Sequence, residues 1–321
     1  MGQRNAMKAK NPMNETNTIN TTNAMNATNV MINTINAINP MKAKNMRSKI
    51  GSVIFKGFCW AYAAFSLFPI VWMIFFSLKN NSEIFVTNPF GFPTTLRWEN
   101  YEKAWSQYDV PTYFFNSFFV ATLTSLFVVV LAALFAYAVA RLKWPGRRIA
   151  QVYMSFGMFV PVQAILIPVA RIVNDMGLGT SRFGLISVYT AINLSFASLV
   201  YYGFLRGIPK ELEEAACIDG ANIFTCFTHV ITPLLAPATA TLVIYTFLNS
   251  WNEFILANVL IQQDSLRTLP LGLLFLQGAF TTDWGAMGAT MVIASLPTIV
   301  LYCVFSKQVE RAITIGGAIK G

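Results

Sequence analysis

The chain has 321 residues, of which 55% are hydrophobic and only 12% are charged. Soluble domains carry about 25% charged residues, because a surface that faces water needs charge. The composition therefore argues against an ordinary soluble domain and predicts a surface that faces lipid over much of its area. The four cysteines are scattered and form no C-x-x-C pair, so neither a disulfide framework nor a zinc site is indicated.

Residues 1–49 differ in composition from the rest of the chain. Asparagine recurs at every third position from Asn14 to Asn29, and the string MKAKN occurs at residues 7–11 and again at 41–45. A segment so polar and repetitive buries too little apolar surface to offset the entropy lost on ordering. We therefore predict a disordered Asn/Thr/Met-rich tail. A true start site at Met41 or Met46 is a second hypothesis for this segment.

Six stretches are long and apolar enough to form membrane-spanning helices, for which about 20 residues cross a hydrocarbon core about 30 Å thick. The expected spans cover residues 52–77, 113–140, 149–173, 183–205, 233–260 and 286–306. Continuous apolar runs favour helices over the alternating pattern of a membrane β-barrel. The predicted fold class is thus an all-α membrane protein, with one six-span domain over residues 50–321.

The distribution of lysine and arginine predicts how these spans are oriented. With the N-terminus inside, sixteen of these residues lie on the inner side and six on the outer side, if Lys56 within the first span is left aside. Inner loops of membrane proteins carry the excess of positive charge, so both termini are expected in the cytoplasm. The same distribution accounts for the net charge of +9 without a nucleic-acid partner.

Catalytic and ion-coupling residues are sparse in the sequence. The expected spans hold no chain of Asp, Glu or His, no phosphate-binding loop G-x-x-x-x-G-K-[ST] is present, and His229 is the only histidine. We therefore expect no catalytic site, no metal site and no cofactor bound by this chain. A membrane enzyme is disfavoured because no catalytic cluster is present.

A stand-alone secondary transporter or channel is the alternative to a transporter that takes its energy from a partner. Secondary transporters often contain broken helices at matching positions in their two halves. Pro161 and Pro168 could break the third expected span, but no matching pair stands out in the other half of the sequence.

The loop over residues 207–233 is acidic and contains a single internal glycine after its start, although it lies between two apolar runs. Glutamates at 211, 213 and 214 fall in an expected first helical turn, where they favour the positive end of the helix dipole. Gly220 lets the chain turn before a second short helix that leads to Pro233. The pattern predicts two short helices that could dock in a groove of another protein. An ordinary solvated loop is the alternative.

This loop resembles the EAA loop of ABC importer permeases, in which E-A-A is followed by three residues, G, nine residues and I-x-L-P. The residues at those spacings are Glu214, Ala215, Ala216, Gly220 and Pro233. Val230 and Thr232 replace the isoleucine and leucine of the family pattern at the end of the loop.

Further strings resemble the permeases of sugar importers, most closely the six-span partner in maltose-type systems. They are PIVWMIFFSLKN at 69–80, FFNSFFVATLTS at 114–125, AYAVARLKWPG at 136–146, WNEF at 251–254 and IGGAIKG at 315–321. The resemblance covers residues 50–321 and excludes the tail before them.

The resemblance implies an importer in the cytoplasmic membrane of a prokaryote. Its other members would be a second permease chain, a pair of ATPases that bind ATP and Mg, and an extracytoplasmic solute-binding protein. The loop would dock in a cleft of the ATPase, and closure of the ATPase pair would switch the spans between inward-facing and outward-facing states. The implied solute is a sugar or oligosaccharide, with a polyol or a glycerol phosphate ester as alternatives.

The resemblance also gives a role to the end of the chain. In maltose-type systems the C-terminal tail of this permease reaches between the ATPases. The tail expected over residues 307–321 carries the matching residues Gly316, Gly317, Lys320 and Gly321. A flexible polar tail without a partner is the alternative.

Four residues near the end of the fifth span are candidates for the translocation path: Asn249, Trp251, Asn252 and Glu253. An aromatic ring together with amide and acid groups suits a sugar, which offers apolar faces and hydroxyls. The alternatives are an interfacial anchor for Trp251 and a position near the outer surface for Glu253. In maltose-type systems the sugar site lies mainly on the other permease.

Overall fold

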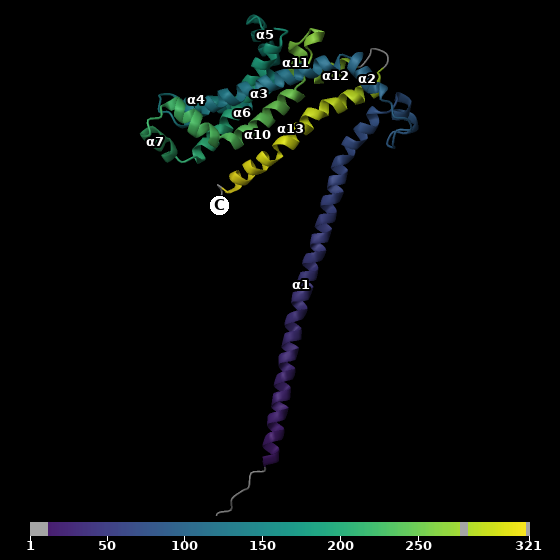
Figure 1. The fold of residues 1–321 in the computed structure, drawn as a ribbon, viewed down its shortest axis with the longest axis vertical. Coiled ribbons are helices and arrows are strands. Elements are labelled where there is room, and N and C mark those ends of the chain that lie inside the picture. Colours follow the sequence, from purple (N-terminus) through teal and green to yellow (C-terminus); the bar gives the residue numbers. More distant parts are fainter. Residues whose placement is uncertain (1–11, 277–281, 319–321) are drawn as a thin grey trace, which may run out of the picture. The chain divides into compact units, whose positions relative to one another are not determined.

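The structure is a computed structural model that describes the backbone of residues 12–276 and 282–318, and the side chains of residues 25–34, 53–276 and 282–305. The described regular elements are all helical, which confirms the predicted all-α class (Figure 1). In chain order they are α1 (Pro12–Ser77), η1 (Glu83–Thr87), α2 (Glu99–Ser106), α3 (Val110–Ala140), α4 (Arg147–Phe156), η2 (Gly157–Phe159), α5 (Val162–Asp175), α6 (Arg182–Gly207), α7 (Glu211–Ile218), α8 (Ile223–Thr225), η3 (Cys226–Ile231), α9 (Thr232–Leu234), α10 (Ala236–Asn252), α11 (Ile255–Leu260), η4 (Asp264–Leu266), α12 (Leu269–Phe275) and α13 (Trp284–Ala318).

Residues 1–70 and 71–321 form two separate units, and the division between them lies within α1. The helix of the first unit begins at Pro12, inside the segment expected to be disordered. Each described side chain from Met25 to Thr34 is exposed, and asparagine and threonine are weak helix formers. Disorder of residues 1–49 in solution stays a prediction, which circular dichroism of a peptide of these residues would test.

Four helices are long and apolar enough to cross a membrane: residues 53–77 of α1, all of α3 and α6, and residues 284–305 of α13. Two bent helix pairs could supply further spans, so the described residues hold four to six. The first pair joins residues 147–159 to α5 with a bend of 109°, and the second joins residues 223–234 to α10 with a bend of 75°. Four expected stretches coincide with single helices and the third coincides with the first bent pair, whereas the second pair covers residues 223–252 instead of the expected 233–260.

The third and fifth expected spans are broken rather than straight. Val160 has an extended backbone because it precedes Pro161, and a residue before proline is disfavoured in the helical region. In the fifth span, Pro233 and Pro237 lie on either side of the bend, and Glu253 is extended where α10 ends. Bends thus occur in both halves of the chain, at the third and the fifth expected stretch. Pro168, by contrast, lies inside α5 without ending it.

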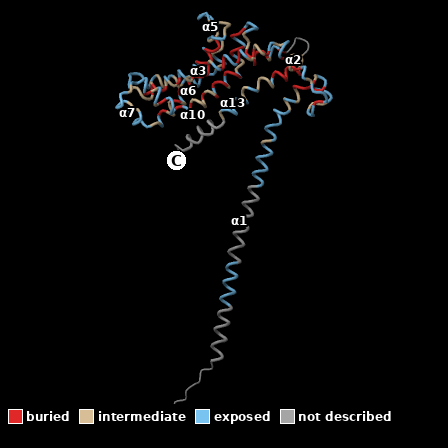
Figure 2. The backbone as a smooth tube through the Cα atoms, viewed as in Figure 1, coloured by how far each residue is buried: buried red, intermediate tan, exposed pale blue. Residues whose placement is uncertain are grey.

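The core of residues 71–321 is built around α3 and α6, which pack against each other extensively. Figure 2 shows the buried positions concentrated along these helices and α10. Ala132, Ala136 and Ala197 are among the fully buried residues where α3 meets α6. Small side chains let two membrane helices approach closely, so this contact is dense without large residues. The C-terminal ends of α3 and α6 therefore form a firm base for the loop that follows α6.

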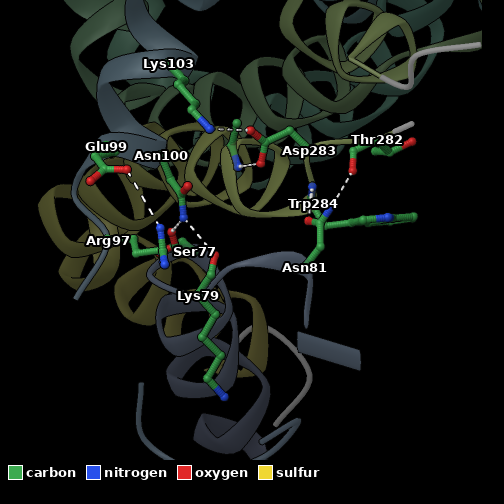
Figure 3. Close-up of polar contacts among 11 residues, drawn as sticks. Ser77, Lys79, Asn81, Arg97, Glu99, Asn100, Lys103, Thr282, Asp283 and Trp284 are labelled. Atoms are coloured by element: carbon green, nitrogen blue, oxygen red, sulfur yellow. Dashed lines mark hydrogen bonds and ion pairs between the residues drawn. The ribbon is translucent and has the colours of Figure 1, made fainter. Parts of the chain in front are cut away.

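A polar cluster joins three segments that lie far apart in the sequence (Figure 3). The Asn100 amide on α2 donates to the backbone carbonyls of Ser77 and Lys79, at 2.8 and 2.9 Å. Lys103 Nζ lies 2.9 Å from Asp283 Oδ2, directly before α13. At Gly285 a Cβ atom would lie 2.5 Å from Asn100 Nδ2, so only glycine permits this approach. The end of α1, helix α2 and the start of α13 are thereby held together.

Candidate functional site

The loop after α6 folds as two helical segments around a glycine turn, as the sequence predicts. Helix α7 ends at Ile218, and Gly220 follows with a φ of +87°. A Cβ atom at Gly220 would meet nothing within 4 Å, so the backbone conformation, and not space, requires glycine here. The Asn222 side chain then caps the second segment by accepting a 2.8 Å hydrogen bond from the Thr225 backbone N–H.

The acidic and small residues of the motif have different surroundings on α7. Glu214 and Ala215 are exposed, whereas Ala216 is partly buried and packs against the core at the ends of α3 and α6. Ile218 and Phe224, on either side of the glycine turn, are 86% and 77% exposed. The loop therefore presents a carboxylate, a small residue and apolar side chains to its surroundings. This combination is typical of a protein contact surface.

An ion pair fastens α7 to the rest of the chain. Arg141, the C-cap residue of α3, has its Nε 2.7 Å from Glu213 Oε1, and the two side chains are only 6% and 15% exposed. Arg141 Nη2 also donates to the carbonyls of Leu205 and Ile208, at 2.7 Å each, where α6 ends. Tyr137 on α3 donates to Glu213 Oε2 at 3.4 Å. Helix α7 is therefore tied to the ends of both α3 and α6.

Sequence reasoning missed this attachment. The sequence predicts the same role for Glu213 and Glu214, a favourable interaction with the helix dipole, because both fall in the first turn of the helix. The available signal was Arg141, the first basic residue after the apolar run of α3, which would need a partner if its side chain were buried.

A cavity of about 300 Å³ lies between the break after α4 and the helices α6 and α10. Its lining includes Gly157 and Val160 at the break, and Tyr189 on α6. Of the four residues expected on the translocation path, Asn249 and Glu253 line this cavity. The Glu253 carboxylate accepts hydrogen bonds from the Tyr189 hydroxyl at 2.5 Å and from the backbone N–H of Leu256 and Ala257, at 2.7 and 3.1 Å.

The other two candidate path residues lie elsewhere. Trp251 is 2% exposed, and its Nε1 donates to the carbonyl of Ala294 on α13 at 3.1 Å. Its ring stacks on that of Phe247, so the side chain is part of the core and not an interfacial anchor. Asn252 is exposed, and its amide donates to the Leu248 carbonyl of its own helix.

Two of the four candidate residues at the end of the chain lie within the last helix. Gly316 and Gly317 lie within α13, which continues to Ala318 instead of ending near residue 306. Residues 307–318, expected to form a tail, are thus helical. Lys320 and Gly321 lie outside the described residues.

Residues 128–315, which include both ends of the Arg141–Glu213 ion pair and the glycine turn, match the family described as the inner membrane component of binding-protein-dependent transport systems. The chain belongs to this family. The resemblance of the chain to ABC importer permeases is thereby confirmed, and so is its function as a permease subunit.

Relatives of this inner membrane component are similar over most of their length. The diacetylchitobiose uptake system permease protein NgcG of Streptomyces coelicolor is 33% identical over 77% of this chain and 82% of the relative. The sulfoquinovosyl glycerol transport system permease protein SmoH of Agrobacterium fabrum is 34% identical over 78% and 88%. The trehalose/maltose transport system permease protein MalG of Thermococcus litoralis is 29% identical over 81% and 93%.

A solved structure supports the same fold. A bacterial ABC transporter that imports the acidic polysaccharide alginate matches 81% of this chain and 96% of its own chain, with a TM-score of 0.72 and 22% sequence identity. The chain is thus a multi-pass inner membrane component, which acts in transport and works with a solute-binding protein. Among the residues that the structure describes, no group of three His, Cys, Asp or Glu side chains is placed to hold a metal ion.

Proposed function

We propose that this permease couples ATP hydrolysis on a separate ATPase to the import of a sugar or oligosaccharide, through the loop 207–233. The observation that carries the proposal is that two adjacent glutamates on α7 have different surroundings. Glu214 and Ala215 face outward, while Glu213 is bound to Arg141 at the end of α3. A force applied to the exposed face would therefore reach two core helices without first bending a flexible linker.

The proposed assembly contains a second permease chain, a pair of ATPases and an extracytoplasmic solute-binding protein. In it the chain would have six spans, with the two bent pairs as the third and fifth, and with both termini in the cytoplasm. The distribution of Lys and Arg supports this orientation. ATP and Mg would be bound by the ATPase partner, and this chain would bind no cofactor.

The proposed solute class rests on the relatives. NgcG is named for diacetylchitobiose and MalG for trehalose and maltose, which are carbohydrates without a net charge. SmoH is named for sulfoquinovosyl glycerol, a carbohydrate derivative with an anionic sulfonate, so the relatives support a sugar but do not select its charge. Asn249 and Glu253 stay our candidates on the translocation path, because both line the cavity. Trp251 and Asn252 lack that support.

The docking role of the loop is tested by reversing one charge. We expect Glu214→Lys to insert normally but to lose both solute uptake and recovery of the ATPase from solubilised membranes, because a basic group would replace the exposed carboxylate. Glu211→Lys is the matched control, since Glu211 is exposed in the same helical turn. Recovery of the ATPase with Glu214→Lys at the level of the control would refute docking through this residue.

We also propose that the end of the chain, with Gly316, Gly317, Lys320 and Gly321, contacts the ATPase pair. The support is the likeness of IGGAIKG to the family ending. In the same recovery experiment, a chain that ends at Ile315 should retain less ATPase than the full chain. Equal recovery would remove this contact from the proposal.

A further inference from the structure

The cavity beside Glu253 has the chemistry of a saccharide site. We infer that it binds one unit of an uncharged sugar during transport, through Asn193, Asn249 and Ser250, and that Glu253 disfavours acidic sugars. The inference rests on the proposed function, because a sugar reaches this cavity only if the chain imports one. It goes further by placing solute contacts on this chain and by stating the charge of the solute.

The position of the cavity is the first support. Its wall includes the break at Gly157 and Val160, where the chain is not α-helical between α4 and α5. Irregular backbone at membrane depth is tolerated only where protein buries it or where it lines a water-filled space. Substrate sites of transporters occur at such broken helices. A cavity of about 300 Å³ is at the lower end of small-molecule sites, which suits a single sugar ring.

The second support is a set of buried polar groups with spare hydrogen-bonding capacity. Ser250 is 4% exposed, lines the cavity, and its Oγ has no hydrogen-bond partner among the described residues. The Asn193 amide donates to the Tyr189 carbonyl, and its Oδ1 lies 3.4 Å from Asn249 Nδ2. Buried polar groups are normally paired, since an unpaired one costs free energy. Sugar hydroxyls, which both donate and accept, would supply the missing partners.

Aromatic rings provide the third support. Phe196 on α6 and Tyr245 on α10 both line the cavity, and their ring centroids lie 4.3 Å apart. The face of a sugar ring is apolar, so it can lie against aromatic side chains while its hydroxyls turn to the amides. The wall thus offers both surfaces that a sugar needs.

Charge decides between classes of sugar. Glu253 is the only charged side chain among the lining residues, and no lysine or arginine accompanies it there. A carboxylate or sulfonate on the solute would come close to the Glu253 carboxylate, and like charges repel each other. An uncharged sugar meets no such penalty. We therefore expect this cavity to prefer another class of solute than the structural neighbour, which imports the acidic polysaccharide alginate.

The experiment compares two asparagines on α10, in native cells whose own copy of the chain is replaced by a variant. Asn249→Leu removes an exposed amide at the cavity, while Asn252→Leu removes an exposed amide outside it. Ser250→Ala is a second cavity variant that keeps the helix and removes only the hydroxyl. The probes are labelled maltotriose, trehalose and N,N′-diacetylchitobiose, with an alginate trisaccharide as the acidic probe.

We expect uptake of at least one uncharged probe and none of the acidic one. Asn249→Leu should lower uptake of the transported sugar by about fivefold to tenfold, as for one lost hydrogen bond, and Ser250→Ala should lower it in the same direction. Asn252→Leu should leave uptake within about twofold of the unchanged chain, because its amide bonds only within its own helix.

Three results would overturn the inference. They are equal uptake by the cavity variants and Asn252→Leu, transport of the acidic probe, and transport of none of the uncharged probes by the unchanged chain. Recovery of the ATPase with the unchanged chain is measured in parallel. If the ATPase is recovered while any of these results holds, the cavity assignment fails and the permease proposal stands. If the ATPase is not recovered, the proposed function fails as well.

Discussion

Two adjacent glutamates on α7 have opposite surroundings. Glu214 is exposed and available to a partner, whereas Glu213 is largely buried against Arg141. The pair matters for the fold because a partly buried charge that loses its partner is strongly destabilising. The spacing of the motif alone could not reveal this difference, since both residues suit the first turn of a helix. Which glutamate faces inward depends on where α3 ends in space.

Removal of the Arg141 side chain should loosen α7. We expect Arg141→Met to lower the free energy of unfolding by about 3 kcal/mol, because it leaves Glu213 and the carbonyls of Leu205 and Ile208 without their donor. Thermal unfolding of the purified chain in detergent measures the change. Lys143→Gln, an exposed residue two positions later, should have little effect.

A double variant separates the ion pair from the carbonyl bonds. Glu213→Gln together with Arg141→Met should be less destabilising than the sum of the two single changes, because the buried charge is gone. Strict additivity would mean that the two side chains do not interact.

At the scale of elements, the polar cluster that joins the end of α1, helix α2 and the start of α13 contains an ion pair. It is formed by Lys103 on α2 and Asp283 directly before α13. Burial by itself raises the pKa of Asp283, but the Lys103 ammonium and the backbone N–H of Ala286 outweigh it, so the pKa lies below its ordinary value of 3.8. The hydrogen bond to Asp283 raises the pKa of Lys103 above its ordinary value of 10.5. Both shifts mean that the folded state favours the charged forms.

The sign of the pH dependence follows from these shifts. The contribution of Asp283 to stability is fully present above its ordinary pKa and is lost as the pH falls through the lower folded value. The contribution of Lys103 is present below its ordinary pKa and is lost only above the raised folded value. We therefore expect Asp283→Asn to lower the unfolding temperature at pH 7 and to lower it less at pH 2, measured in a detergent stable at both. Glu102→Gln, an exposed change on α2, is the control. Equal losses at both pH values would contradict the prediction.

The elements also show what could be predicted from the sequence. Each apolar run corresponds to a helix or a bent helix pair, because the length of a span is set by the bilayer and is visible in hydropathy. The bends could not be located in the same way. Pro161 lies at a break and Pro168 lies inside α5, although both interrupt one apolar run. The residue type does not distinguish the two positions, because membrane helices tolerate proline where neighbouring groups satisfy the freed backbone. Trp251 is a related case, since its burial depends on Phe247 and on α13.

At the scale of the whole molecule, helix α6 connects the loop 207–233 to the candidate saccharide cavity. The loop is tied to the ends of α3 and α6, and residues of α6 and α10 line the cavity. A shift of α6 driven at its loop end would therefore also move Tyr189 and Asn193 at the cavity. In the proposed scheme the cavity lies among the membrane spans and the loop contacts an ATPase in the cytoplasm. The scheme therefore requires that the loop lie on the cytoplasmic side.

The native cysteines test this orientation without a new label. Cys217 is exposed on α7, while Cys226 is buried, and Cys59 and Cys303 lie within membrane-spanning segments. We expect a membrane-impermeant maleimide to label Cys217 in inside-out vesicles, and not in right-side-out vesicles, because α7 would face the cytoplasm. Mass spectrometry of the digested chain identifies the labelled residue. Cys217→Ser is the control, and it should abolish the labelling in inside-out vesicles. Labelling of Cys217 in intact right-side-out vesicles would reverse the orientation, and it would place the loop out of reach of any cytoplasmic ATPase.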